Sequence, residues 1–135
     1  MSRRLLVAAG LAGSLAIAAS APAAAPPTPP KLVGTVGSGY TTLVGTVGPG
    51  FAISLTRKGT KVTQLKAGKY LFVIADRASI HNFVLEQASG GKFEKTFTTV
   101  GFRGTNIYAL TLAKGRYKYY CRPHESSMFG NFTVS

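Results

Sequence analysis

The stretch YYCRPHESSMFGNFTV, residues 119–134, contains three side chains that can bind a soft metal ion. Cys121 is the only cysteine of the chain, and His124 and Met128 follow it closely. Thiolate and imidazole ligands suit copper or zinc, and a thioether at a weak axial position favours copper. A second imidazole is needed, and the chain has only one other histidine, His81. The sequence therefore predicts one mononuclear copper site with four ligands: His81, Cys121, His124 and Met128.

The segments that must position these side chains are short, rich in β-branched and aromatic residues, and separated by glycines. They predict an all-β fold, an antiparallel sandwich or Greek-key barrel. His81 opens one expected strand, and Cys121 closes another, in which the alternation of RYKYYC turns Cys121 inward. Region 89–104 is expected to be a long irregular connection. The expected strands are FAISLT (51–56), KVTQL (61–65), KYLFVIAD (69–76), HNFVLE (81–86), NIYALTL (106–112), RYKYYC (116–121) and NFTV (131–134).

The N-terminal third has the composition of an export segment rather than of a folded domain. Arg3 and Arg4 precede a small-residue apolar run at 5–19, which is too short to span a membrane. We therefore expect a signal peptide at 1–25, using either the general or the twin-arginine route, and a periplasmic or extracellular protein. A Pro-rich spacer with an extra repeat segment is expected at 26–42, and the copper-binding domain at 43–135.

Two near copies, LVGTVGSGY (32–40) and LVGTVGPGF (43–51), follow one another at the start of the expected domain. Two copies are too few for a solenoid. We expect the second copy to lead into the first core strand and the first to form an extra edge strand or an ordered tail.

Counting residue types excludes several other site classes. A binuclear copper centre needs two cysteines, and a multicopper oxidase needs more than two histidines. A structural zinc site could use His81, Cys121 and His124, but its fourth position would fall to a poor zinc ligand. Hydrolase chemistry at Cys121 and His124 lacks a clear orienting acid, unless Glu125 served. The protein is therefore not expected to be an enzyme.

SIHNFVL (79–85) together with YKYYCRPHESSMFGNFTV resembles the two metal-binding signatures of the cupredoxins, the type 1 blue-copper proteins such as plastocyanin, pseudoazurin and amicyanin. The resemblance covers about residues 43–135 and extends to small exported bacterial plastocyanin-like proteins. It implies an eight-stranded, two-sheet Greek-key sandwich and an electron carrier with one type 1 copper ion. It also implies equatorial ligands His81, Cys121 and His124, an axial Met128, and Asn82 bracing the ligand loop. The alternative is a module that buffers or delivers copper.

Two details of the ligand segment bear on the reduction potential. His124 and Met128 are four residues apart, one fewer than in plastocyanin, and Pro123 has no N–H to donate to the Cys121 thiolate.

For electron exchange we expect a small apolar patch around the exposed edge of His124, formed by Pro123, Met128 and Phe129. Tyr120 faces outward in the expected strand, where it is either a second, lateral port or an ordinary surface residue.

The charge of the chain limits its partners. The formal net charge is +12, and it is +10 without the two arginines of the export segment. Nucleic acid is not expected as a partner, because the lysines are scattered along the chain rather than clustered. A basic surface suits an acidic redox partner, such as a cytochrome or an oxidase, or association with an anionic envelope surface. We expect the protein to be a monomer.

Overall fold

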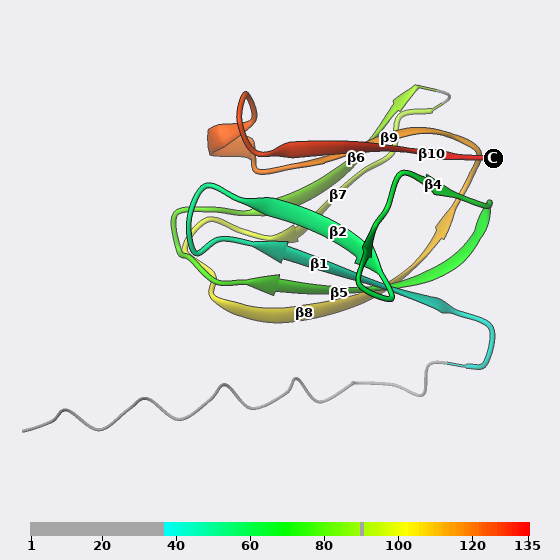
Figure 1. Ribbon diagram of the computed structural model, residues 1–135, viewed down its shortest axis with the longest axis horizontal. Coiled ribbons are helices and arrows are strands. Elements are labelled where there is room, and N and C mark those ends of the chain that lie inside the picture. The colour runs from blue at the N-terminus through cyan, green and yellow to red at the C-terminus, as the bar shows by residue number, and fades with distance from the viewer. Residues whose placement is uncertain (1–36, 90) are drawn as a thin grey trace, which may run out of the picture.

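The computed structural model describes residues 37–89 and 91–135, which form two five-stranded β-sheets packed face to face (Figure 1). The expected export segment at 1–25 and residues 26–36 of the expected spacer lie outside the described residues. The all-β sandwich predicted from the sequence is confirmed. No helix within the described residues is long and apolar enough to cross a membrane.

The first sheet has the strand order β3-β2-β1-β5-β8. Its central strand β1 runs parallel to the next strand, β5, and pairs with it from Thr41 opposite Tyr70 to Val47 opposite Asp76. The other neighbours in this sheet are antiparallel. The strands are β1 (Thr41–Val47), β2 (Ile53–Arg57), β3 (Thr60–Lys61), β5 (Gly68–Asp76) and β8 (Gly104–Leu112).

The second sheet has the strand order β4-β10-β9-β6-β7. β9 lies between β10 and β6 and is antiparallel to both, so the strand that carries Cys121 at its end is central. Only the short β4 pairs in parallel, with β10. The strands are β4 (Gln64–Leu65), β6 (Phe83–Ser89), β7 (Glu94–Thr98), β9 (Gly115–Tyr120) and β10 (Phe129–Val134); a single 3₁₀ turn, η1 (Arg122–His124), precedes β10.

Three expectations about individual segments were wrong. The single strand expected at 61–65 is split, because β3 pairs with β2 in the first sheet and β4 pairs with β10 in the second. Region 89–104 is not irregular throughout, because β7 pairs with β6 inside it. The charged residues Glu94 and Lys95 at the start of β7 make this strand hard to recognise in the sequence. The second repeat copy does not merely lead into a core strand: β1 itself carries it, with Leu43 and Val47 fully buried. β1 begins at Thr41, two residues before the expected domain boundary, and most of the first copy lies outside the described residues.

The core lies between the two sheets and is filled by alternate residues of each strand. Aromatic rings from the second sheet stack in pairs: Phe83 lies 5.8 Å from Tyr119, and Tyr117 lies 5.3 Å from Phe132, measured between ring centroids. Five of the aromatic residues buried in this core are Phe72, Phe83, Tyr117, Tyr119 and Phe132.

Connections from both sheets meet at one end of the sandwich, on the left in Figure 1. They are the turn from β1 to β2, the crossing from β5 to β6, and the loop from β9 to β10. The last two contain all the histidine and cysteine of the chain. The topology therefore gathers side chains that are about 40 residues apart in sequence.

Candidate metal centre

His81 lies in the crossing from β5 to β6, two residues before β6 begins. Its backbone N–H donates to the carbonyl of Ala78 over 3.2 Å, which closes a tight turn after Asp76. The side chain is completely buried. The turn therefore delivers the imidazole inward at the end of the sandwich.

Cys121 and His124 lie on the loop that joins β9 to β10. Cys121 follows the last residue of β9 and is completely buried, as the alternation of RYKYYC predicts. The chain then turns through η1, where the His124 N–H donates to the Cys121 carbonyl over 3.1 Å. Pro123 fits this turn because its fixed φ suits the first helical positions and its missing N–H is not needed there. The turn brings the His124 ring back over Cys121.

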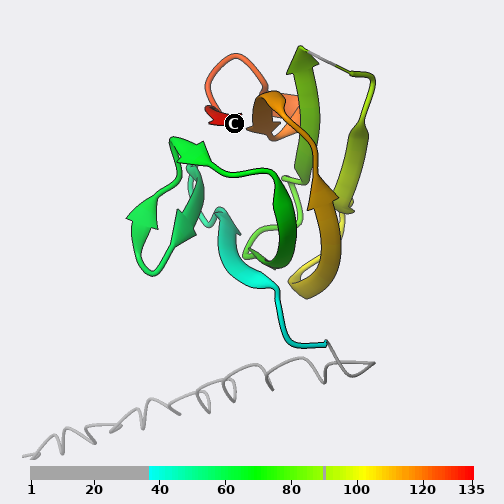
Figure 2. The same ribbon diagram turned by 90° about the vertical axis from the view of Figure 1, so that its right-hand side faces the viewer.

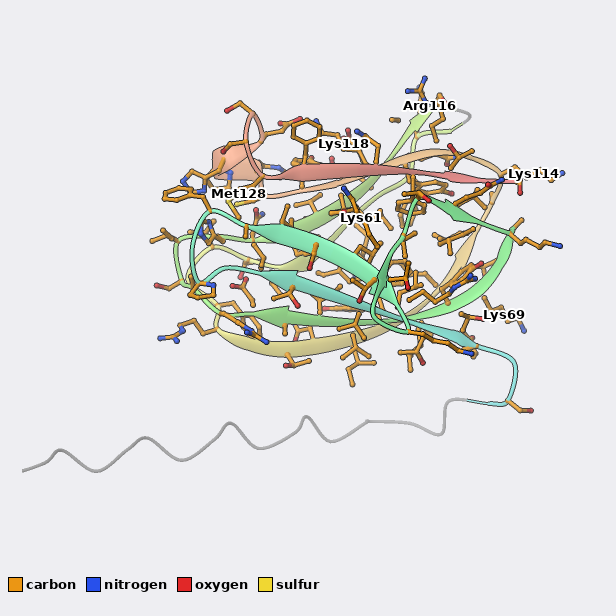
Figure 3. All side chains as sticks on the ribbon, in the orientation of Figure 1. Lys61, Lys69, Lys114, Arg116, Lys118 and Met128 are labelled. Carbon is orange, nitrogen blue, oxygen red and sulfur yellow. The ribbon has the colours of Figure 1, made fainter. Side chains whose placement is uncertain are left out.

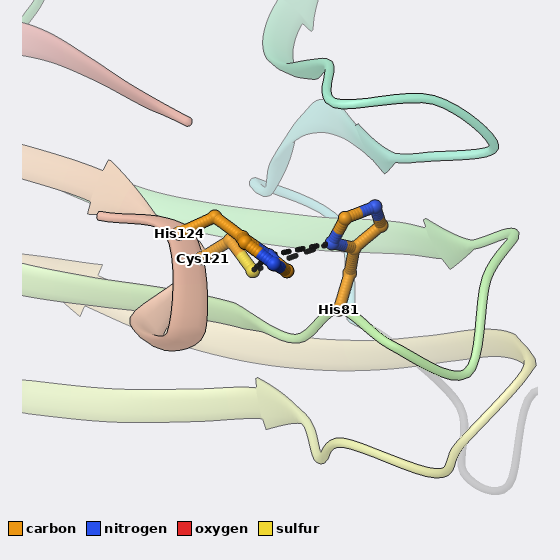
Figure 4. A group of neighbouring side chains, drawn as sticks. All are labelled: His81, Cys121 and His124. Atoms are coloured by element: carbon orange, nitrogen blue, oxygen red, sulfur yellow. Dashed lines mark hydrogen bonds between the residues drawn. The ribbon is translucent and has the colours of Figure 1, made fainter. Parts of the chain in front are cut away.

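The three candidate ligand atoms form a nearly equilateral triangle (Figure 4). Nδ1 of His81 lies 3.1 Å from Nδ1 of His124, and Cys121 Sγ lies 3.6 and 3.5 Å from these two nitrogens. A point about 2.0 Å from all three atoms follows from those sides, close to metal–nitrogen and metal–thiolate bond lengths of about 2.0–2.3 Å. The three side chains are thus positioned to bind one copper ion without moving.

The hydrogen bond of His81 on its far side selects the tautomer that a metal requires. Nε2 lies 3.0 Å from the carbonyl oxygen of Gly50, in the turn from β1 to β2. A carbonyl only accepts, so Nε2 carries the proton and Nδ1 presents its lone pair toward Cys121 and His124. Such an outer hydrogen bond orients a metal-binding imidazole and raises its basicity. Gly50 is a supporting residue that the sequence reasoning missed.

Met128 lies against the same site and is almost completely buried. Its N–H donates to the His124 carbonyl over 2.8 Å, and its carbonyl accepts from the Cys121 N–H over 3.0 Å. A single backbone turn therefore spans the four-residue interval between His124 and Met128. All four predicted ligands are brought to the same end of the molecule, three of them with their ligand atoms in mutual contact.

The comparisons with known proteins agree with this geometry. The family model of copper-binding proteins of the plastocyanin/azurin family matches residues 57–135, which include all four predicted ligands. The chain belongs to this family. The resemblance to cupredoxins is thereby confirmed, and with it the copper ion as cofactor.

Solved structures share the fold of this cupredoxin at low sequence identity. Rusticyanin is 20% identical, with a TM-score of 0.51 over 70% of this chain and 76% of that chain. Reduced auracyanin from Roseiflexus castenholzii is 17% identical, with a TM-score of 0.53 over 72% of this chain and 98% of that chain. The search of curated proteins gives no match.

Asn82 links the two ligand-bearing connections of the cupredoxin, as the resemblance implied. Its side-chain oxygen accepts a 2.7 Å hydrogen bond from the backbone N–H of Arg122, which directly follows Cys121. Asn82 is 94% buried, so this bond is largely shielded from water. It fixes the distance between the His81 turn and the Cys121 loop.

Replacing Asn82 with alanine is expected to lower the free energy of unfolding by about 1–3 kcal/mol, because the Arg122 N–H loses its partner. The looser loop should also release copper to a chelator faster. Urea unfolding and chelator competition measure the two effects. Asn106→Ala is the matched control, since the Asn106 amide of β8 donates to the Phe97 carbonyl of β7, between the two sheets and not at the ligand loop. Equal copper release from both variants would contradict the bracing role.

The surface next to His124 differs from the expected apolar patch. Phe129 is exposed, with its ring centroid 5.5 Å from the Lys118 ammonium, whereas Met128 is almost completely buried and so has no place at the exposed His124 edge. Phe51 takes that place: its ring meets His124 and His81 edge-on, with centroids 4.9 and 5.5 Å apart, and is 64% exposed. In the sequence, Phe51 directly follows Pro49 and Gly50, a turn signal that could have indicated an exposed aromatic residue on this loop.

The expected outward exposure of Tyr120 was wrong. Tyr120 does lie outside the core cluster, but only 4% of it is exposed. Its hydroxyl donates to Glu94 over 3.3 Å, Glu94 also pairs with Arg122, and the Lys118 ammonium lies 5.0 Å from its ring. Burial raises the pKa of Tyr120. Glu94 of β7 and Lys118, two residues earlier in β9, thus lie over Tyr120, which is too buried to form the expected lateral port.

Asp76, at the end of β5, is a buried carboxylate that the sequence reasoning did not single out. Its Oδ1 accepts from the Ala78 N–H over 3.2 Å, and its Oδ2 has no partner among the described residues. Burial raises the pKa of Asp76, although nearby Thr98 and the hydrogen bond from Ala78 oppose this. The folded state therefore holds the proton more strongly than the unfolded chain, so this carboxyl lowers stability as the pH rises through its raised pKa.

Proposed function

We propose that this cupredoxin is a blue-copper electron carrier that shuttles single electrons in the cell envelope. The proposal rests on the triangle of His81, Cys121 and His124, whose atoms already surround one metal-sized position. These three are the proposed equatorial ligands, and Met128 is the proposed weak axial ligand. Copper bound there would supply a couple between copper(II) and copper(I). Because the protein holds the ligands in one arrangement, they would move little when the copper changes oxidation state.

The chain's own residues favour rapid transfer by keeping the site dry except at one edge. His81, Cys121 and Met128 are buried, whereas His124 is half-buried beside the exposed ring of Phe51. Cys121 Sγ lies 3.6 and 3.5 Å from the Nδ1 atoms of His81 and His124. We propose the His124 edge and Phe51 as the place where electrons enter and leave.

The proposed partner is another redox protein, such as a cytochrome or an oxidase, that meets a monomer of this chain at the Phe51 surface. Arg77 and Arg103 are exposed at the same end of the sandwich, which suits an acidic partner. The proposed location, in the periplasm or outside the cell, rests on the N-terminal sequence.

Voltammetry and chelator competition on the copper-loaded protein test this function together. We expect a reversible one-electron wave, and copper that stays bound when a strong chelator is added, because three of the four proposed ligands are almost completely buried. Copper that passes readily to the chelator with no reversible wave would overturn electron carriage and favour copper delivery.

A further inference from the structure

Exposed cations gather at the end of the sandwich opposite the copper site. Figure 3 places Lys69, Lys114 and Arg116 at one end and Met128 at the other. Figure 2 looks onto the basic end. We call this surface the basic pole; its six residues, all exposed, are Arg57, Lys66, Lys69, Lys92, Lys114 and Arg116.

The strand register puts these residues at one end although they come from several connections. Lys69 lies near the start of β5 opposite Thr111, near the end of β8. Arg116 lies near the start of β9 opposite Thr133, near the end of β10. Lys66 precedes Ala67, whose N–H donates to the carbonyl of Ser135 over 2.8 Å.

Two further cations complete the basic pole. Arg57 shares with Lys66 and Ser135 the lining of a hollow of about 530 Å³. Lys92 lies in the turn between β6 and β7. The cations thus spread over the whole end of the molecule instead of lining one narrow groove.

None of the four acidic residues of the chain lies at the basic pole. Asp76 is buried at the copper end of β5. Glu125 and Glu94 pair with Lys118 and Arg122, which flank Cys121. Glu86 lies midway along β6, opposite Lys118. The acidic side chains therefore reduce the positive charge near the copper site, and none of them lies among the cations of the basic pole.

The basic pole is poorly placed to receive a redox partner. β5 runs from the basic pole at Gly68 to the copper end at Asp76, roughly 25 Å at about 3.3 Å per residue. A partner bound there would lie far from the copper, whereas the exposed apolar residues Phe51, Ile80 and Val100 surround the copper end. The two ends are thus suited to different contacts.

We propose that the basic pole docks the protein onto an anionic phospholipid surface and leaves the copper end facing the aqueous phase. A bilayer matches a broad array of lysine and arginine side chains with no acid among them, because each such side chain near an anionic leaflet strengthens binding about fivefold. Docking in this orientation keeps His124 and Phe51 open to a partner. The inference goes beyond the proposed function and does not depend on it.

Vesicle binding tests the docking directly. The protein is expressed with its own N-terminal sequence, isolated and loaded with copper. It is then titrated with neutral phosphatidylcholine vesicles and with anionic vesicles that contain phosphatidylglycerol. We expect binding to the anionic vesicles that is released by high salt. The triple variant Lys66→Gln, Lys69→Gln, Lys114→Gln should bind them about 100-fold more weakly.

A variant with the same loss of charge elsewhere is the matched control. Arg77→Gln, Lys95→Gln, Arg103→Gln also removes three positive charges, but from the copper half of the molecule. It should retain most of the binding to anionic vesicles. Circular dichroism and urea unfolding of both variants establish that each is folded.

Orientation is read from the copper itself. Reduction of the vesicle-bound protein by ascorbate should proceed as fast as that of the free protein, because the copper end faces water. Slower reduction on vesicles would mean that the copper end contacts the bilayer, and would overturn the proposed orientation.

Three binding results would overturn the docking proposal itself. They are equal binding to neutral and anionic vesicles, equal losses in the two triple variants, and binding to a soluble polyanion such as heparin without binding to vesicles. Because partitioning is measured without any redox reaction, its failure is distinguishable from failure of the proposed electron transfer.

Discussion

The copper-loaded protein should lose its intense visible absorption band completely when Cys121 is replaced with serine. The band expected for the native protein arises from charge transfer between the cysteine thiolate and copper(II), and the chain has no other cysteine to replace it. The serine hydroxyl is a harder ligand that does not hold copper(I) well, so the reversible redox wave should disappear too. Visible absorption and voltammetry of the copper-loaded variant measure both effects.

Ser126→Ala is the matched control for this experiment. Ser126 is an exposed residue of the same loop, two positions after His124. Its substitution should leave the band unchanged. A Cys121→Ser protein that keeps the blue band, or a native protein that binds only zinc and is colourless, would contradict the ligand assignment.

Replacing Gly130 with alanine is expected to lower the free energy of unfolding by about 2–3 kcal/mol, in the range typical of overpacked cores. Gly130 lies opposite Tyr119 in the β9–β10 ladder, and a Cβ there would overlap the Tyr119 ring and hydroxyl. The ring cannot easily give way, because it is 1% exposed and stacks on Phe83. Urea unfolding of the copper-free and copper-loaded forms measures the loss.

Gly68→Ala provides the comparison. Gly68 begins β5, its φ is not positive, and no atom lies within 4 Å of a Cβ added there. This substitution should be neutral or slightly stabilising, because it reduces the freedom of the unfolded chain. If both alanine variants unfolded at the same urea concentration, the close approach of Tyr119 to Gly130 would not matter for stability.

The positive charges of this protein are unevenly placed relative to the copper site, which affects the partners that they can attract. The net charge alone suggested steering of an acidic partner toward the copper. The six residues of the basic pole instead lie at the other end of β5, far from His124. Steering at the copper end depends on a few residues, among them Arg77 and Arg103, whereas overall attraction to an anionic surface depends on the basic pole.

Sequence reasoning succeeded where residue type limits chemistry. Cys121 and the two histidines are so scarce that a soft metal site has only one way to be built, and the alternation of RYKYYC is enough to turn Cys121 inward. It failed for Tyr120 and β7, where cross-strand neighbours decide the outcome. Tyr120 points away from the core as predicted, yet Glu94 of β7 and Lys118 of its own strand lie against it.

By itself, the sequence determined the all-β class, the family and the identity of the metal-binding side chains, because these depend on composition, alternation and the few residues able to bind copper. The tertiary structure decided what surrounds them. The Gly50 carbonyl selects the His81 tautomer, Phe51 flanks His124, and Gly130 leaves room for Tyr119. It also separated the basic pole from the copper end. Each of these features joins residues from different strands or turns, and such contacts exist only once both sheets have assembled.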